Sequence, residues 1–141
     1  MNIDSIRNGV VLDHIQAGKS MDIYRDLHLD ALDCPVAIIK NARSDRMGSK
    51  DIIKIDSPME LDLDVLGYID PNITVNIIRD GKRVEKKHLE LPHKLVNIIR
   101  CKNPRCITAV EPQLDSIFLL SDSSRHSYRC AYCEAEEGKR D

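Results

Sequence analysis

The chain has 141 residues, of which 31% are charged, and its formal net charge is −2 at pH 7. This balance gives no bulk electrostatic attraction to nucleic acid or to an anionic membrane surface. No apolar run approaches the roughly 20 residues of a membrane-spanning helix, and residues 1–4 lack the basic and apolar regions of a secretion signal. We therefore expect a cytoplasmic protein without a membrane partner, in which closely spaced cysteines are metal ligands rather than disulfides.

The first 92 residues alternate strand and helix patterns. β-Branched runs predict strands at 9–15, 35–39, 51–55 and 73–78, and Asp80-Gly81 predicts a hairpin turn into a strand at 83–86. Helices are expected at 20–29, with Ser20 as N-cap, and directly after Ser57-Pro58. Residues 41–49 are polar and contain Gly48, which predicts a loop.

This order of elements is β-α-β-β-α-β with one additional hairpin strand. It is typical of a ferredoxin-like α+β fold, in which both helices cover one face of an antiparallel sheet. The other face is then free for a ligand or a partner.

A change in charge and a proline mark a domain boundary. Residues 1–92 carry 13 Lys and Arg against 16 Asp and Glu, a net charge of −3, whereas residues 93–141 carry 8 against 7, a net charge of +1. Pro92 interrupts any regular element at this point. We predict two domains, 1–92 and 93–141, the second with short strands at 95–99, 116–120 and 127–129 around a metal.

Four cysteines of the second domain form two close pairs. Four residues separate Cys101 from Cys106, two separate Cys130 from Cys133, and 23 lie between the pairs. Two such pairs supply four thiolates to one tetrahedral ion, with zinc the usual occupant, and a closed sphere of four protein ligands predicts a structural site. Nearby cations are expected to offset the thiolate charge; they are Arg100, Lys102, Arg105 and Arg129. Cys34 has no such partner and is predicted to be a buried, inert thiol.

The strand at 51–55 carries lysines on one face. Period-two alternation places Lys50, Ile52 and Lys54 on one face, an arrangement suited to binding a phosphate and the flat side of a base. More often, however, such a pattern marks an ordinary solvent-exposed face. Asp13 and His14 fit either a sugar or base contact or the end of a strand. No nucleophile elbow, Walker-type loop or second metal cluster is found, so no catalytic residue and no enzyme activity are predicted.

In combination, these segments resemble the aspartate carbamoyltransferase regulatory chain family. The matching stretches run in order along nearly the whole chain; they are 6–15, 47–55, 74–76, 101–107, Glu111-Pro112 and 130–134. Each motif is weak alone, but their conjunction is specific.

The resemblance implies a non-catalytic subunit of pyrimidine biosynthesis with ATP, CTP and UTP as effectors. Its first domain would bind nucleotides and form a homodimer, and its zinc domain would dock on the catalytic chain and link catalytic trimers. The positions that correspond to nucleotide contacts are Ile6, Val11, Asp13, His14, Ile52, Lys54, Asn76, Ile78 and Lys86. Among these, Lys54 and Lys86 fit base and ribose contacts, and Lys86 also phosphate.

A competing hypothesis is a zinc-ribbon protein that binds nucleic acid. It is supported by the cysteine spacing and by a basic cluster that contains Lys82, Arg83, Lys86, Lys87 and His88. The near-neutral charge and the lack of aromatic stacking residues argue against it.

Overall fold

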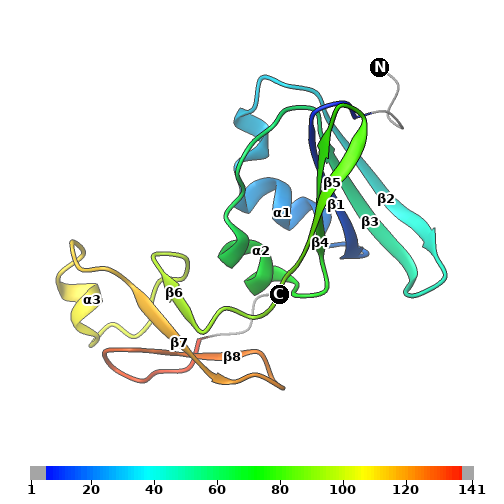
Figure 1. Cartoon of the computed structure of the whole chain (residues 1–141). Helices are drawn as coiled ribbons and strands as arrows, with labels where there is room; N and C mark the ends of the chain where they lie inside the picture. Colours follow the sequence, from blue (N-terminus) through cyan, green and yellow to red (C-terminus); the bar gives the residue numbers. More distant parts are fainter. Residues whose placement is uncertain (1–5, 138–141) are drawn as a thin grey trace. The chain divides into compact units, whose positions relative to one another are not determined.

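The computed structural model describes residues 6–137, and the chain divides into two compact units between Glu90 and Leu91 (Figure 1). Each unit has a sheet of its own. No helix within residues 6–137 is long and apolar enough to cross a membrane.

The first unit is a five-stranded antiparallel sheet with two short α-helices. Its strands are β1 (Gly9–Gln16), β2 (Val36–Ser44), β3 (Gly48–Ile55), β4 (Thr74–Arg79) and β5 (Lys82–His88), in the order β2-β3-β1-β4-β5. The helices are α1 (Ser20–Asp26) and α2 (Leu63–Ile69), with a 3-10 turn, η1, at Leu29–Ala31. This confirms the predicted ferredoxin-like α+β fold, with β5 as the additional hairpin strand at one edge.

Alternation along the strands separates a core face from an outer face. Val10, Leu12 and Ile15 of β1 are buried in the core, and both α-helices lie on that side of the sheet (Figure 1). Lys50, Ile52 and Lys54 of β3 alternate with buried residues and are only half-buried. They therefore belong to the opposite face, which we call the outer face.

The predicted loop and the predicted start of the second helix are wrong. Residues 41–49 are not a loop, because β2 continues to Ser44 and β3 begins at Gly48. The turn between them needs only three residues. The Ser44 hydroxyl accepts a hydrogen bond of 3.1 Å from the Met47 amide, and Gly48 adopts a φ of 79°. Likewise, α2 does not begin after Ser57-Pro58 but at Leu63, because the carboxylate of Asp62 caps it.

The first helix is also shorter than predicted. It ends at Asp26, and Lys19 rather than Ser20 occupies its N-cap position. The Ser20 hydroxyl instead donates a bond of 2.6 Å to the carboxylate of Asp51, which is fully buried. The Ser20 side chain, predicted to cap the helix, therefore stabilises a buried carboxylate that is distant in sequence.

The second unit is a three-stranded antiparallel sheet with one helical turn. Its elements are β6 (Lys94–Val96), α3 (Ile107–Val110), β7 (Ile117–Asp122) and β8 (Ser127–Cys130), with the strands in the order β6-β7-β8. Leu95, Phe118 and Tyr128 fill a small core, and the Tyr128 hydroxyl donates to the Pro92 carbonyl over 2.7 Å. The predicted strand at 95–99 is shorter because Asn97 adopts a φ of 58°.

Candidate functional site

The four paired cysteines come together at the edge of the second sheet. Their sulfur atoms all lie within 4.8 Å of one another, with Cys101 and Cys133 3.6 Å apart and Cys106 and Cys130 3.7 Å apart. Four sulfurs around one zinc ion at ~2.3 Å are separated by roughly 3.8 Å, whereas a disulfide needs ~2.05 Å. The donor set and its spacing therefore fit one structural zinc ion, and all four cysteines are free of disulfides.

Backbone geometry brings the two pairs together. Cys106 is the N-cap of α3, and Cys130 ends β8. Glu134 closes the turn that contains Cys133. It adopts a φ of 63°, and its backbone amide donates a hydrogen bond of 2.9 Å to the Cys130 carbonyl. Cys106 thus both offers a sulfur to the ion and begins the helix that follows.

The thiols of this cluster cannot all ionise equally well on their own. Burial raises the pKa of Cys101, whereas the backbone amide of Ala135 lowers the pKa of Cys133. A divalent cation removes this conflict because it replaces the protons of all four thiols. The cluster is therefore arranged for metal binding rather than for four independent thiols.

Of the basic residues beside the cysteines, Arg129 contacts the C-terminal segment. It donates to the Glu134 carbonyl over 3.2 Å and lies 3.9 Å from the Glu136 carboxylate. That the basic residues offset the thiolate charge stays a prediction. The neighbour that sequence reasoning missed is Thr108, whose hydroxyl is 3.1 Å from the Cys106 sulfur. Its position two residues after a ligand at a helix start is the signal that points to it.

A second cluster crosses the outer face of the first sheet. In the strand registers, Lys54 of β3 is opposite Val11, Val11 is opposite Asn76 of β4, and Asn76 is opposite Lys86 of β5. These four residues form one row across four adjacent strands, which we call the central row. Alternation predicts the face of each residue, but only the registers bring them side by side.

Asn76 lies in the middle of the central row and is only 9% exposed. Its side-chain nitrogen donates to the Val11 carbonyl over 3.3 Å. Its side-chain oxygen is buried and has no hydrogen-bond partner among the described residues. An unpaired buried acceptor is costly, so this oxygen is suited to a donor that arrives with a ligand.

On one side of the central row, a bulge in β1 organises Asp13 and His14. Asp13 forms an ion pair of 2.9 Å with Lys50 and accepts a bond of 2.6 Å from the His14 amide. His14 adopts a φ of 59°, and its Nδ1 lies 2.5 Å from the Thr74 hydroxyl. Sequence reasoning missed Thr74, although it shares the outer face with Asn76 by alternation.

Burial and neighbouring charges shift the pKa values of Asp13 and His14. Burial opposes ionisation of Asp13, but its bond to Lys50 lowers the carboxyl pKa below the usual range. Burial lowers the pKa of His14; the negative charge of Asp13 opposes this shift, and nearby cations such as Lys50 add to it. At neutral pH the outer face therefore carries an ionised Asp13, a neutral His14 and several lysines.

The remaining predicted contacts flank the central row. Ile52 lies on β3 between Lys50 and Lys54, on the Asp13 side. On the other side, Ile78 is opposite Gly9, and Ile6 is buried against Gly9. The structure therefore places the nine predicted residues on or beside one sheet face, although their role in binding stays a prediction.

The chain matches two domain models over nearly its whole length. Residues 1–90 match the allosteric domain of the aspartate carbamoyltransferase regulatory chain, and residues 93–141 match the metal-binding domain of that chain. These matches account for the cysteine cluster as a metal site. They do not favour the nucleic-acid-binding alternative.

Several bacterial proteins of this name are similar to the chain. The regulatory chain of Clostridium botulinum (strain Hall) is 49% identical over 134 residues, which cover 95% of this chain and 92% of the relative. That of Clostridium acetobutylicum is 50% identical over 134 residues, with the same two coverages. That of Bifidobacterium longum is 46% identical over 136 residues, 96% of this chain and 98% of the relative.

Proposed function

Because the chain belongs to the aspartate carbamoyltransferase regulatory chain family, we propose that it binds ATP, CTP and UTP on its outer face and links catalytic trimers through its second unit. The chain is a non-catalytic regulatory subunit of pyrimidine biosynthesis, with an allosteric and a metal-binding domain.

The buried oxygen of Asn76 is the observation that carries the nucleotide proposal. It lies in the central row between Val11 and Lys86, and no described residue donates to it. A ribose hydroxyl or an exocyclic amino group supplies the missing donor. The free energy of leaving this acceptor unpaired, about 1–3 kcal/mol, is then recovered only when a ligand binds.

The charges around Asn76 suit the rest of a nucleotide. Lys54 and Lys86 stand at the two ends of the central row, and a triphosphate is best held by such cations through charge-assisted bonds. Val11 and Ile52 are half-buried apolar residues of the same face that offer contact to a base. Lys50, on the same face, is held in place by its ion pair with Asp13.

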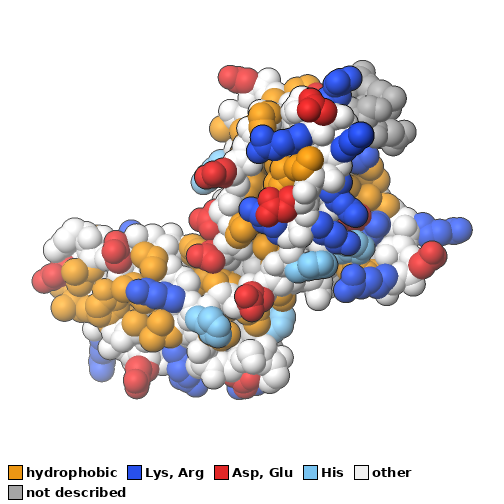
Figure 2. Space-filling view, in the orientation of Figure 1, with side chains coloured by type: hydrophobic (Ala, Val, Ile, Leu, Met, Phe, Trp, Pro, Cys, Tyr) orange, Lys and Arg blue, Asp and Glu red, His pale blue; other side chains and the backbone are white. Residues whose placement is uncertain are grey.

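The metal supports docking of the second unit on a catalytic chain. A zinc ion would be held by the four cysteines and would contribute folding free energy to this unit. Cys106 is also the N-cap of α3, on which Ile107 is 47% and Val110 71% exposed. Hydrophobic side chains gather over this helix in Figure 2. We propose that the catalytic chain binds this apolar patch on α3, because metal binding at Cys106 would fix the position of the helix.

The first unit is proposed to form a homodimer through the edge of β2. The other edge, β5, carries Lys82, Arg83, Glu85, Lys86 and Lys87, and such charges oppose pairing of two edges. In contrast, Val36, Ala37, Ile38 and Ile39 of β2 are uncharged. Two β2 edges can therefore pair without bringing like charges together over this stretch.

A cytoplasmic location follows from the cysteines. The four thiols are arranged to bind metal in their reduced form, and Cys34 is free as well. Such thiols persist in a reducing compartment.

Calorimetric titration of the zinc-loaded chain with ATP, CTP and UTP tests the effector proposal. We expect saturable binding of ATP and CTP, and none of a single-stranded DNA oligonucleotide. A folded, zinc-loaded chain that binds none of the nucleotides would contradict the proposal. Salt-dependent binding of the oligonucleotide would instead favour a nucleic-acid-binding protein.

A further inference from the structure

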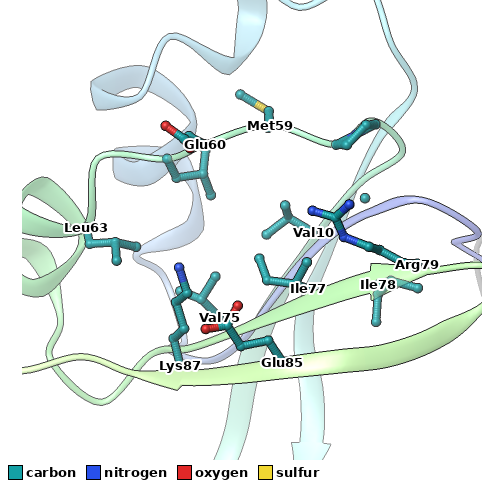
Figure 3. Close-up of a pocket in the computed structure, with 13 residues that line it drawn as sticks. Val10, Met59, Glu60, Leu63, Val75, Ile77, Ile78, Arg79, Glu85 and Lys87 are labelled. Atoms are coloured by element: carbon teal, nitrogen blue, oxygen red, sulfur yellow. The ribbon is translucent and has the colours of Figure 1, made fainter.

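A cavity of about 430 Å³ lies on the core side of the first sheet, on the opposite side of β1 and β4 from the central row. Its volume falls in the range of small-molecule sites. Apolar side chains of β1, β4, the segment before α2 and the first residue of α2 line it; they are Val10, Met59, Leu61, Leu63, Val75 and Ile77. Opposite β4, the cavity is lined by the irregular segment 58–62 and by Leu63 at the start of α2 (Figure 3).

Four charged side chains surround this aliphatic floor, and they are unevenly distributed. Arg79, at the end of β4, extends toward Val10, and its guanidinium lies apart from the acidic side chains (Figure 3). Lys87, Glu85 and Glu60 lie at the other end of the cavity. Within residues 6–137, none of these four side chains forms a salt bridge. One end is therefore positive, and the other carries two acids and one cation.

We propose that this cavity binds an aliphatic monocarboxylate, with its carboxylate on Arg79 and its hydrocarbon chain over Val10, Val75 and Ile77. A guanidinium without an anionic partner is suited to a bidentate bond with a carboxylate. The floor is made of branched aliphatic side chains and contains no aromatic ring, so it favours a flexible chain over a planar base. The net charge at the Glu60 end disfavours the reverse orientation.

This site is separate from the proposed nucleotide site. Val11 and Asn76 face the outer side of β1 and β4, whereas Val10 and Val75 of the same strands face the cavity. The proposal therefore does not depend on nucleotide binding, and its failure would leave the effector proposal untouched.

Calorimetric titration of the zinc-loaded full chain with octanoate, below its micelle-forming concentration, tests the proposal. Octanol serves as the uncharged analogue with the same hydrocarbon body. We expect saturable octanoate binding at a single site and weaker binding of octanol. In methyl NMR spectra, octanoate should shift the signals of Val10, Val75 and Leu63, and leave those of Val11 and Ile52 in place.

Two matched variants test the position of the carboxylate. Arg79→Met should weaken octanoate binding by about tenfold, the loss of one charge-assisted contact, and leave octanol binding unchanged. Lys82→Met removes the same charge from the residue opposite Arg79, which does not line the cavity, and should keep octanoate affinity. The proposal is overturned if octanoate does not saturate, if octanol binds equally well, or if the Arg79→Met chain binds octanoate like the unmodified chain.

Discussion

Lys54 and Lys86 stand at opposite ends of one row across the outer face, with Val11 and Asn76 between them. Because neighbouring strands are ~4.8 Å apart, three strand steps separate the two lysine backbones by roughly 14 Å. Long lysine side chains at both ends leave room between them for a base and a ribose over the middle of the row. The two residues are 32 positions apart in sequence but act, in our proposal, on one ligand.

Removing either lysine should weaken nucleotide binding. For Lys54→Met or Lys86→Met we expect about a tenfold loss of ATP and CTP affinity, because each removes one charge-assisted contact. The matched control is Lys87→Met, on the same strand but facing the cavity side. Calorimetry should show unchanged nucleotide binding for that control, and equal losses in all three variants would contradict the assignment of the outer face.

Asn76→Leu separates binding from stability. The change removes a buried oxygen without a partner and one bond to the Val11 carbonyl, so the two effects on the free energy of unfolding nearly cancel, to within ~1 kcal/mol. Nucleotide affinity should nevertheless fall by about tenfold. Urea unfolding and titration of the same samples check both numbers. A large loss of stability with intact binding would show that Asn76 is structural.

Loss of one thiolate should remove the metal and unfold the second unit. Cys133→Ser leaves three sulfurs at the site, and metal binding contributes much of the folding free energy of such a small domain. We expect no bound zinc by elemental analysis and no assembly with catalytic trimers, while the first unit still binds nucleotides. Cys34→Ser, in the other unit and outside the cluster, is the control and should keep both zinc and assembly.

Asp51 should make the first unit sensitive to acid. Burial opposes its ionisation, but the Ser20 hydroxyl and the amides of Gly18, Ser20 and Asn41 donate to it and lower its pKa. A carboxyl with a lowered pKa in the folded state stabilises the fold above its unfolded pKa of ~3.9, and this stability is lost as pH falls through the folded pKa.

Asp51→Asn should therefore cost at least about 2 kcal/mol at neutral pH and flatten the decline in stability below pH ~4. Hydrogen exchange at amides of β1 and β3 reports the first unit alone, which matters because acid also displaces zinc from thiolates. If the variant and the unmodified chain lose protection in parallel as pH falls, Asp51 is not the group that titrates.

The metal site was predictable because its signal is local. The spacing of Cys101, Cys106, Cys130 and Cys133 indicates four ligands without any knowledge of the sheet. Strand alternation likewise predicted the faces of Ile52 and Lys54. Only the register, which long-range pairing decides, places Lys54, Asn76 and Lys86 in one row.

The short helix α3 and the start of α2 were not predicted correctly, because the sequence carries too weak a signal for the first and two competing signals for the second. The helix α3 has four residues, too few for a hydrophobic period to appear. Ser57-Pro58 looked like a helix start, but the chain runs on to Asp62 and covers β4 on the way. The aliphatic cavity exists because of this irregular segment.

Sedimentation velocity of the zinc-loaded chain, mixed with trimers of the catalytic chain from the same organism, tests the regulatory role most directly. We predict a new species larger than either component, which disappears when the Cys133→Ser chain is used. A folded, zinc-loaded chain that leaves the trimer boundary unchanged at concentrations near those of a cell would contradict the account.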